Sequence, residues 1–221
     1  MRWLRARRWY WRRRADLPEC LARVWSQPLP KTRELVKDLR FLVCDAEMTS
    51  LDPKHGELLS LGWVGVEGLE IDLGSARHLF LRSDRSVGAS ATIHGLRDCE
   101  LKTGMPPVEA LEALVAAADG RVLVFHHASL DRAFLDAISQ RNWGSPFLLP
   151  LIDTQRIEAR LLRRHGDVRP DGALRLSACR ARYGLGAYRA HSALGDAVAT
   201  AELMLAQIAR RGTGLRFRDL A

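Results

Sequence analysis

The stretch that decides the fold is Phe41-Leu-Val-Cys-Asp-Ala-Glu47, in which two acidic residues end an apolar run. Four consecutive apolar residues, Phe41 to Cys44, indicate a strand that is covered on both faces of a sheet. Side chains alternate along a strand, so Asp45 and Glu47 point to the same side. Two adjacent carboxylates at the end of a core strand repel each other and lose solvation, and a divalent cation between them relieves both costs. The sequence therefore predicts a metal site here.

The bulk composition predicts a globular domain of ordinary size. The chain has 221 residues, of which 47% are hydrophobic and 27% are charged, and this profile is typical of globular proteins. Its formal net charge of +8 predicts attraction to polyanions such as nucleic acid. No apolar run approaches the roughly 20 residues that span a bilayer, so we expect no transmembrane segment and a cytoplasmic protein.

The cysteines give no sign of a metal site or of a disulfide framework. The four cysteines have neither CxxC nor zinc-type spacing; they are Cys20, Cys44, Cys99 and Cys179. We therefore expect free thiols in a reducing compartment.

The order of the expected elements predicts the fold class. The strands come first as a meander and later alternate with helices, which favours an α/β fold with a mixed sheet and helices on both faces. Strands are expected over 41–44, 58–66, 69–73, 78–81, 121–125 and 151–152, and helices over 107–118, 130–140, 154–162, 176–182 and 192–210. We expect a basic N-terminal extension (1–38), a catalytic domain (39–212) and a short C-terminal tail (213–221).

Three later residues complete a possible catalytic set with Asp45 and Glu47. Asp131 and Asp196 each fall in the first turn of an expected helix, and His191 lies on the loop before the last helix. Two divalent cations held by such carboxylates can activate a water and neutralise a departing 3′ oxygen. An imidazole that titrates near neutrality can accept the proton of that water. Any one of these residues alone has an ordinary alternative, such as a helix-terminus acid or a surface histidine, but the five together favour a metal-dependent nuclease.

The same residues lie in segments that resemble a known family. The matching segments are Asp45-Ala-Glu-Met-Thr-Ser-Leu-Asp-Pro53, Ile93-His-Gly-Leu96, His126-His-Ala-Ser-Leu-Asp131 and His191-Ser-Ala-Leu-Gly-Asp-Ala-Val-Ala-Thr200. They resemble the DEDDh exonucleases, the DnaQ-like group of the ribonuclease H-like superfold, and are similar to the catalytic domain of the DNA polymerase III epsilon subunit. The resemblance implies a five-stranded mixed sheet and two Mg²⁺ or Mn²⁺ ions. It also implies that the four acids, Asp45, Glu47, Asp131 and Asp196, are metal ligands and that His191 is the general base.

The resemblance also implies a set of substrate-binding residues. Met48, Thr49, Ser50 and Leu51 resemble the residues that line the family's nucleotide pocket, and His94 resembles a histidine that contacts the terminal nucleotide, although a plain turn is an alternative for His94. The chain departs from the family's usual residues at four positions. These are Met48 for threonine, Ser50 for glycine, His127 for asparagine and Leu130 for phenylalanine. They leave the metal ligands intact and leave the substrate preference open.

The leading hypothesis is a 3′–5′ exonuclease that releases nucleoside monophosphates from DNA 3′ ends. It includes a proofreading subunit of a polymerase, but little sequence follows Arg210, so we expect a stand-alone repair or turnover enzyme. One alternative is an RNA exonuclease of the same fold that trims tRNA ends or short oligoribonucleotides. Another is a non-catalytic module that binds nucleic acid.

The first 14 residues differ in composition from the remaining sequence. They contain seven arginines and no acidic residue, together with Trp3, Trp9 and Trp11. Such an arm could bind phosphates and stack on bases, dock on a protein partner, contact an anionic membrane or remain a solvated tail. The sequence leaves these four alternatives open.

Overall fold

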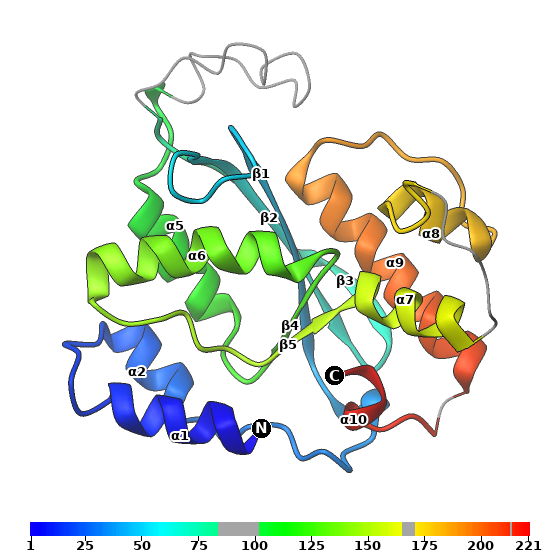
Figure 1. The fold of residues 1–221 in the computed structure, drawn as a ribbon, viewed down its shortest axis with the longest axis horizontal. Helices are drawn as coiled ribbons and strands as arrows, with labels where there is room; N and C mark the ends of the chain where they lie inside the picture. Colours follow the sequence, from blue (N-terminus) through cyan, green and yellow to red (C-terminus); the bar gives the residue numbers. More distant parts are fainter. Residues whose placement is uncertain (84–101, 165–170, 213) are drawn as a thin grey trace.

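The protein is built on a five-stranded sheet, which Figure 1 shows as a ribbon; the computed structural model describes residues 1–83, 102–164, 171–212 and 214–221. The strand order is β3-β2-β1-β4-β5. The strands are β1 (Phe41–Met48), β2 (Leu58–Glu67), β3 (Glu70–Phe80), β4 (Val122–Phe125) and β5 (Leu151–Asp153). The pairs β1–β2 and β2–β3 are antiparallel, whereas the pairs β1–β4 and β4–β5 are parallel. The predicted mixed sheet is confirmed.

Helices cover both faces of the sheet, as the sequence order predicts (Figure 1). They are α5 (Pro107–Ala117), α6 (Ala128–Trp143), α7 (Thr154–Arg164), α8 (Leu176–Arg182) and α9 (Ala193–Arg211). The alternation along β1 separates two hydrophobic cores. Leu42 and Cys44 pack in the core that includes residues of α5 and α6. Phe41 and Val43 pack in the core that includes residues of α9, so Asp45 and Glu47, which share their side of the strand, face α9.

The two acids lie within the central strand, which corrects the prediction that they end a strand at the sheet edge. Strand β1 continues to Met48 because β2 pairs with it along its whole length, with Asp45 opposite Gly62 and Glu47 opposite Ser60. On the other side, β4 pairs only with Phe41–Val43. The acids therefore have a backbone partner on one side and an open side beyond the end of β4.

Strand β3 is one continuous strand, whereas the sequence predicts two short strands. The register of β2 and β3 shifts between Trp63 and Gly65. At the shift, the backbone N–H of Gly65 donates to the Ser75 hydroxyl, at 2.7 Å. A bulge of this kind absorbs one irregular stretch without ending the strand, and the glycine and polar residues at 72–75 therefore do not separate two strands.

The terminal segments form helices that join the same cores. They are α1 (Arg2–Trp11), α2 (Glu19–Ser26), the 3-10 turn η1 (Val36–Asp38) and α10 (Phe217–Leu220). Leu4 and Trp25 are buried with residues of α5 and α6, and Phe217 is buried with Val36. Residues 1–14 thus form a packed helix and turn instead of a solvated tail, and the division of the chain at residue 38 remains a prediction. Within the described residues, no helix has the length and apolar character to span a membrane.

A close backbone contact at Gly62 sets the position of α9. A Cβ atom at Gly62 would lie 2.2 Å from the Leu194 nitrogen and 2.3 Å from the Ala193 carbonyl carbon. The first turn of α9 therefore rests on the backbone of β2, directly opposite Asp45. Glycine within a strand commonly marks such an approach of another backbone.

We predict that Gly62→Ala destabilises the protein, because the added methyl meets main-chain atoms that cannot rotate away. The free energy of unfolding should fall by about 1–3 kcal/mol, measured by urea denaturation. Gly65→Ala is the matched control, since its Cβ would meet the Ser75 hydroxyl, at 2.8 Å, and a side chain can rotate. Equal losses in the two variants would contradict the backbone contact as the cause.

Candidate active site

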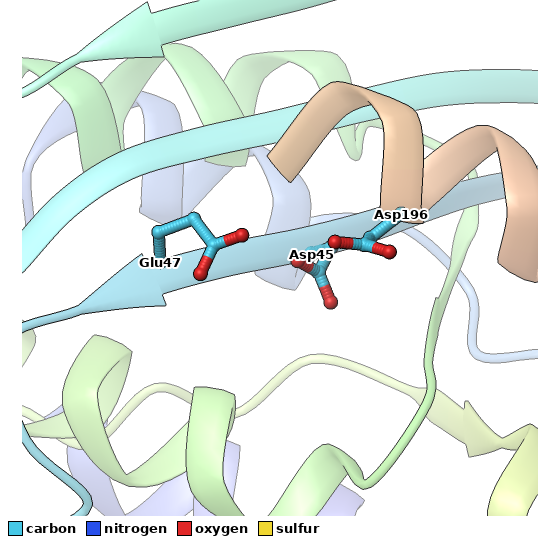
Figure 2. A group of neighbouring side chains, drawn as sticks. All are labelled: Asp45, Glu47 and Asp196. Atoms are coloured by element: carbon cyan, nitrogen blue, oxygen red, sulfur yellow. The ribbon is translucent and has the colours of Figure 1, made fainter. Parts of the chain in front are cut away.

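Three carboxylates converge above the central strand (Figure 2). One carboxylate oxygen from each of Asp45, Glu47 and Asp196 lies within 4.8 Å of the others. Asp45 and Glu47 come from β1, and Asp196 comes from the first turn of α9. Glu47 and Asp196 are buried, and Asp45 is partly exposed. We call these three residues the acidic cluster.

Asp131 lies beside the acidic cluster on the first turn of α6. Its side chain is buried, and its carboxylate is close enough to the Ala46 backbone, between the two acids of β1, for that backbone to lower its pKa. The charge of Asp131 also raises the pKa of Asp45 and of Glu47. The structure therefore brings all four predicted acids into one region. Asp131 lies beside the acidic cluster but is not one of its three residues.

Burial and neighbouring charges raise the pKa values of Asp45, Glu47 and Asp131. Burial is the largest cause of the rise at Asp45, followed by the charges of Asp131 and Asp196, and its pKa lies well above the ordinary range. Burial, and then the charge of Asp196, raise the pKa of Glu47 to about 8. Burial also raises the pKa of Asp131 to about 7. The protein alone therefore does not stabilise the fully ionised cluster.

His191 lies next to the acidic cluster on the loop before α9. Its backbone has φ of 67°, in the left-handed region that residues other than glycine rarely adopt. In this conformation its N–H donates a hydrogen bond to Asp196 Oδ2, at 2.9 Å. The side chain is exposed. The loop is thus fixed against the same carboxylate that joins the cluster.

Tyr188 is a residue of the site that the sequence analysis missed. Burial, followed by the interaction of its hydroxyl with the Asp196 carboxylate, raises the pKa of Tyr188. The guanidinium of Arg180 lies 4.8 Å from the centre of the Tyr188 ring, and it donates to the Ala199 carbonyl of α9, at 2.7 Å. The three-residue spacing to His191 is the only signal in the sequence, and spacing alone did not indicate a contact with Asp196.

The predicted nucleotide-pocket residues follow the cluster along the chain. Met48 is buried at the end of β1, and the Thr49 hydroxyl accepts a hydrogen bond from the Glu57 backbone N–H, at 2.9 Å. Ser50 is exposed, and Leu51 is 79% exposed, which is unusual for a large apolar side chain. His94 lies outside the described residues.

The chemistry of the donor set suits a divalent cation. Carboxylate oxygens are the ligands that Mg²⁺ and Mn²⁺ prefer, and the cluster offers three of them within 4.8 Å of one another. A cation among them would offset the repulsion that raises the pKa values of Asp45 and Glu47. The residues present therefore fit the metal dependence of exonucleases.

Comparisons with known proteins identify the family of the chain. The family model of the RNase_T exonucleases matches residues 42–204. The DNA polymerase III PolC-type of Thermotoga maritima is 28% identical over 169 residues, which are 76% of this chain and 12% of that protein. The DNA polymerase III subunit epsilon-like protein of Rhodobacter capsulatus is 30% identical over 181 residues, which are 76% of this chain and 23% of that protein. The chain thus spans less than a quarter of the length of either relative.

Solved structures share the fold at low sequence identity. Cell-death related nuclease 4 (CRN-4) superposes with a TM-score of 0.67 and 15% identity, over 79% of this chain and 65% of that one. Exonuclease I of E. coli in complex with a dA16 oligonucleotide superposes with a TM-score of 0.60 and 15% identity, over 76% of this chain and 40% of that one. The family match, the fold and the acidic cluster agree: the chain belongs to the RNase_T exonuclease family, with the DnaQ-like form of the ribonuclease H-like fold.

Proposed function

We propose that this protein is a divalent-metal-dependent 3′–5′ exonuclease that removes nucleoside monophosphates from DNA 3′ ends. The observation that carries the proposal is the convergence of Asp45, Glu47 and Asp196, with Asp131 beside them. The choice of DNA is supported by relatives named as DNA polymerases. It is also supported by the similarity to exonuclease I of E. coli, whose structures include complexes with dA16 and dT13 oligonucleotides.

The four acids are the proposed ligands of two Mg²⁺ or Mn²⁺ ions. When bound, such ions activate a water molecule and neutralise the charge on the departing 3′ oxygen. Asp131 and the three residues of the acidic cluster would hold them. The His191 backbone N–H positions Asp196 through its hydrogen bond to the carboxylate, and Tyr188 interacts with the same carboxylate.

His191 is the proposed general base. Its side chain is exposed, so it is accessible to a water at the site. It would accept the proton that the attacking water loses. The hydrogen bond from its own backbone to Asp196 fixes the loop that carries it.

The segment after β1 is the proposed site for the terminal nucleotide. Leu51 presents an exposed apolar side chain close along the chain to Glu47, which suits contact with a base. Met48, Thr49 and Ser50 complete this segment, and His94 is proposed for the same nucleotide from the family resemblance. RNA remains the second candidate substrate, because discrimination depends on contacts to the 2′-OH.

We predict that the purified protein shortens a 5′-labelled single-stranded DNA stepwise from its 3′ end with Mg²⁺ or Mn²⁺, and that EDTA stops the reaction. His191→Ala should lower kcat about 100-fold or more, because it removes the proton acceptor. Binding of the oligonucleotide in EDTA should stay near that of the parent protein. Denaturing gels with 5′- and 3′-labelled strands of DNA and of matching RNA measure direction and sugar preference together.

The control for this experiment is Glu70→Gln, which alters an exposed carboxylate on β3 outside the site and should leave the rate unchanged. If the protein shortens the RNA strand faster than the DNA strand, RNA replaces DNA as the proposed substrate. Failure to cleave either polymer with both metals, while both still bind, would support the non-catalytic module and contradict the enzyme.

We predict that Glu47→Gln stabilises the metal-free protein and removes its stabilisation by metal. The folded-state pKa of Glu47 is raised to about 8, so its stability contribution is present below the unfolded-state pKa and is lost as pH rises through about 8. The advantage of the variant in Tm should therefore be small at pH 5 and about 10 °C at pH 9. Mn²⁺ should raise Tm in the parent protein and much less in the variant.

Differential scanning fluorimetry in EDTA and in Mn²⁺ makes this comparison. Glu70→Gln again serves as the matched control, because it neutralises one carboxylate without touching the cluster. A Tm difference between Glu47→Gln and the parent that does not change from pH 5 to pH 9 would exclude ionisation of Glu47 as its cause.

A further inference from the structure

Helix α1 packs on the domain through one face. Leu4 and Arg8 of this face are buried, and Met1 and Trp11 are partly buried against the same core. The Arg8 Nε donates a hydrogen bond to the Leu148 carbonyl, at 2.8 Å. The apolar side of α1 is therefore occupied by contacts within the chain.

The outer face of α1 alternates aromatic and basic side chains. Trp3, Arg7 and Tyr10 follow one another at intervals of four and three residues within α1, so they lie on the same side. Arg14, in the turn after α1, lies over the Tyr10 ring. The Arg7 guanidinium lies 4.7 Å from the centre of the Trp3 ring, and the Arg14 guanidinium lies 4.1 Å from that of Tyr10. Trp3 is 58% exposed and Tyr10 is 42% exposed. We call these four residues the aromatic-arginine face.

The Trp3 end of this face opens into a cleft that reaches the helix carrying Asp131. The cleft has a volume of about 650 Å³ and is lined by Trp3 on one side and by Ser129 and Arg132 of α6 on the other, with Arg156 of α7. Arg132 directly follows Asp131 in the sequence. Within the described residues, the guanidinium groups of Arg132 and Arg156 have no hydrogen-bond or ion-pair partner, and both side chains are exposed.

The Asp153 carboxylate in this cleft accepts hydrogen bonds from backbone N–H groups. Asp153 lines the cleft, but its two oxygens accept hydrogen bonds from the N–H groups of His127, Ala128 and Gln155, at 3.1, 3.2 and 2.9 Å. These donors lie at the N-terminal ends of α6 and α7, whose dipoles offset a negative charge. The arginines of the cleft therefore keep their positive charge available for another anion.

We propose that the aromatic-arginine face and this cleft form a binding tract for single-stranded nucleic acid, which holds the strand upstream of the 3′ end that is hydrolysed. Bases stack on Trp3 and Tyr10, and the arginines Arg7, Arg14 and Arg132 contact phosphates. Proteins that bind single strands combine a basic groove with aromatic stacking in this way. The proposal rests on the proposed function, because it assigns the same strand to both places.

The distribution of side chains on α1 favours nucleic acid over a membrane surface. A helix that lies on a bilayer separates an apolar face, which enters the lipid, from a basic face. In α1 the apolar face packs on the protein, and Trp3 and Tyr10 alternate with arginines on one side of the helix, while Trp9 stacks with Arg13 on another side. Alternation of this kind suits a polymer in which flat bases alternate with phosphates.

The test compares two double variants that remove the same residue types from different sides of α1. The first variant, Trp3→Ala with Arg7→Ala, alters the aromatic-arginine face. The second, Arg5→Ala with Trp9→Ala, alters another side of the helix. Three of these side chains are exposed, and Arg7 is partly buried. Binding of a fluorescent 20-nucleotide single strand is measured by anisotropy in EDTA. Hydrolysis of the small ester thymidine 5′-monophosphate p-nitrophenyl ester is measured with Mn²⁺, and circular dichroism checks folding.

We expect the Trp3/Arg7 variant to bind the strand about tenfold more weakly, and the Arg5/Trp9 variant to bind within about threefold of the parent. Both should hydrolyse the small ester at the parent rate, because the ester does not reach α1.

Equal weakening of strand binding in the two variants, or no weakening in either, overturns the proposed binding tract. Selective loss of binding to anionic phosphatidylglycerol vesicles, with strand binding unchanged, also overturns it and assigns the face to a membrane. Failure of the parent to hydrolyse any substrate would contradict the proposed function while the binding comparison still decides the tract.

Discussion

The repulsion among buried carboxylates is the constraint on which the site depends. Asp45, Glu47 and Asp196 bring oxygens within 4.8 Å of one another, and Asp131 adds a fourth charge that raises the pKa of Asp45 and Glu47. An arrangement of this kind is unfavourable for the ionised protein alone. A divalent cation among the oxygens would offset this repulsion, and the cluster is therefore expected to bind metal.

The rest of the structure holds these charges together against their repulsion. The bare backbone of Gly62 lets α9 approach β2 closely enough to place Asp196 above Asp45. A hydrogen bond from the His191 backbone fixes the Asp196 carboxylate, and the Tyr188 hydroxyl interacts with the same carboxylate. The early end of β4 leaves the other side of the acids open, and Asp131 interacts with the Ala46 backbone between them.

The fold class and the four acids of the site were predictable from the sequence, because they follow from local patterns and from a family resemblance. The apolar run before Asp45 predicted a core strand, and the helical periodicity after His191 predicted α9. The place of β1 at the centre of the sheet depends on pairing with β4, which lies about 80 residues away. The role of Tyr188 depends on a contact across a loop, and no periodicity indicates such a contact. The packing of α1 depends on Leu148, about 140 residues away from Arg8.

The most direct test of this account is the number of Mn²⁺ ions bound per chain. Electron paramagnetic resonance of free Mn²⁺, measured at pH 8 in a titration with a nucleoside monophosphate present, gives this number. The account predicts saturable binding of about two ions in the parent protein and loss of at least one in Asp196→Asn. Absence of saturable Mn²⁺ binding in the parent protein, or unchanged binding in Asp196→Asn, would contradict the claim that the acidic cluster binds metal.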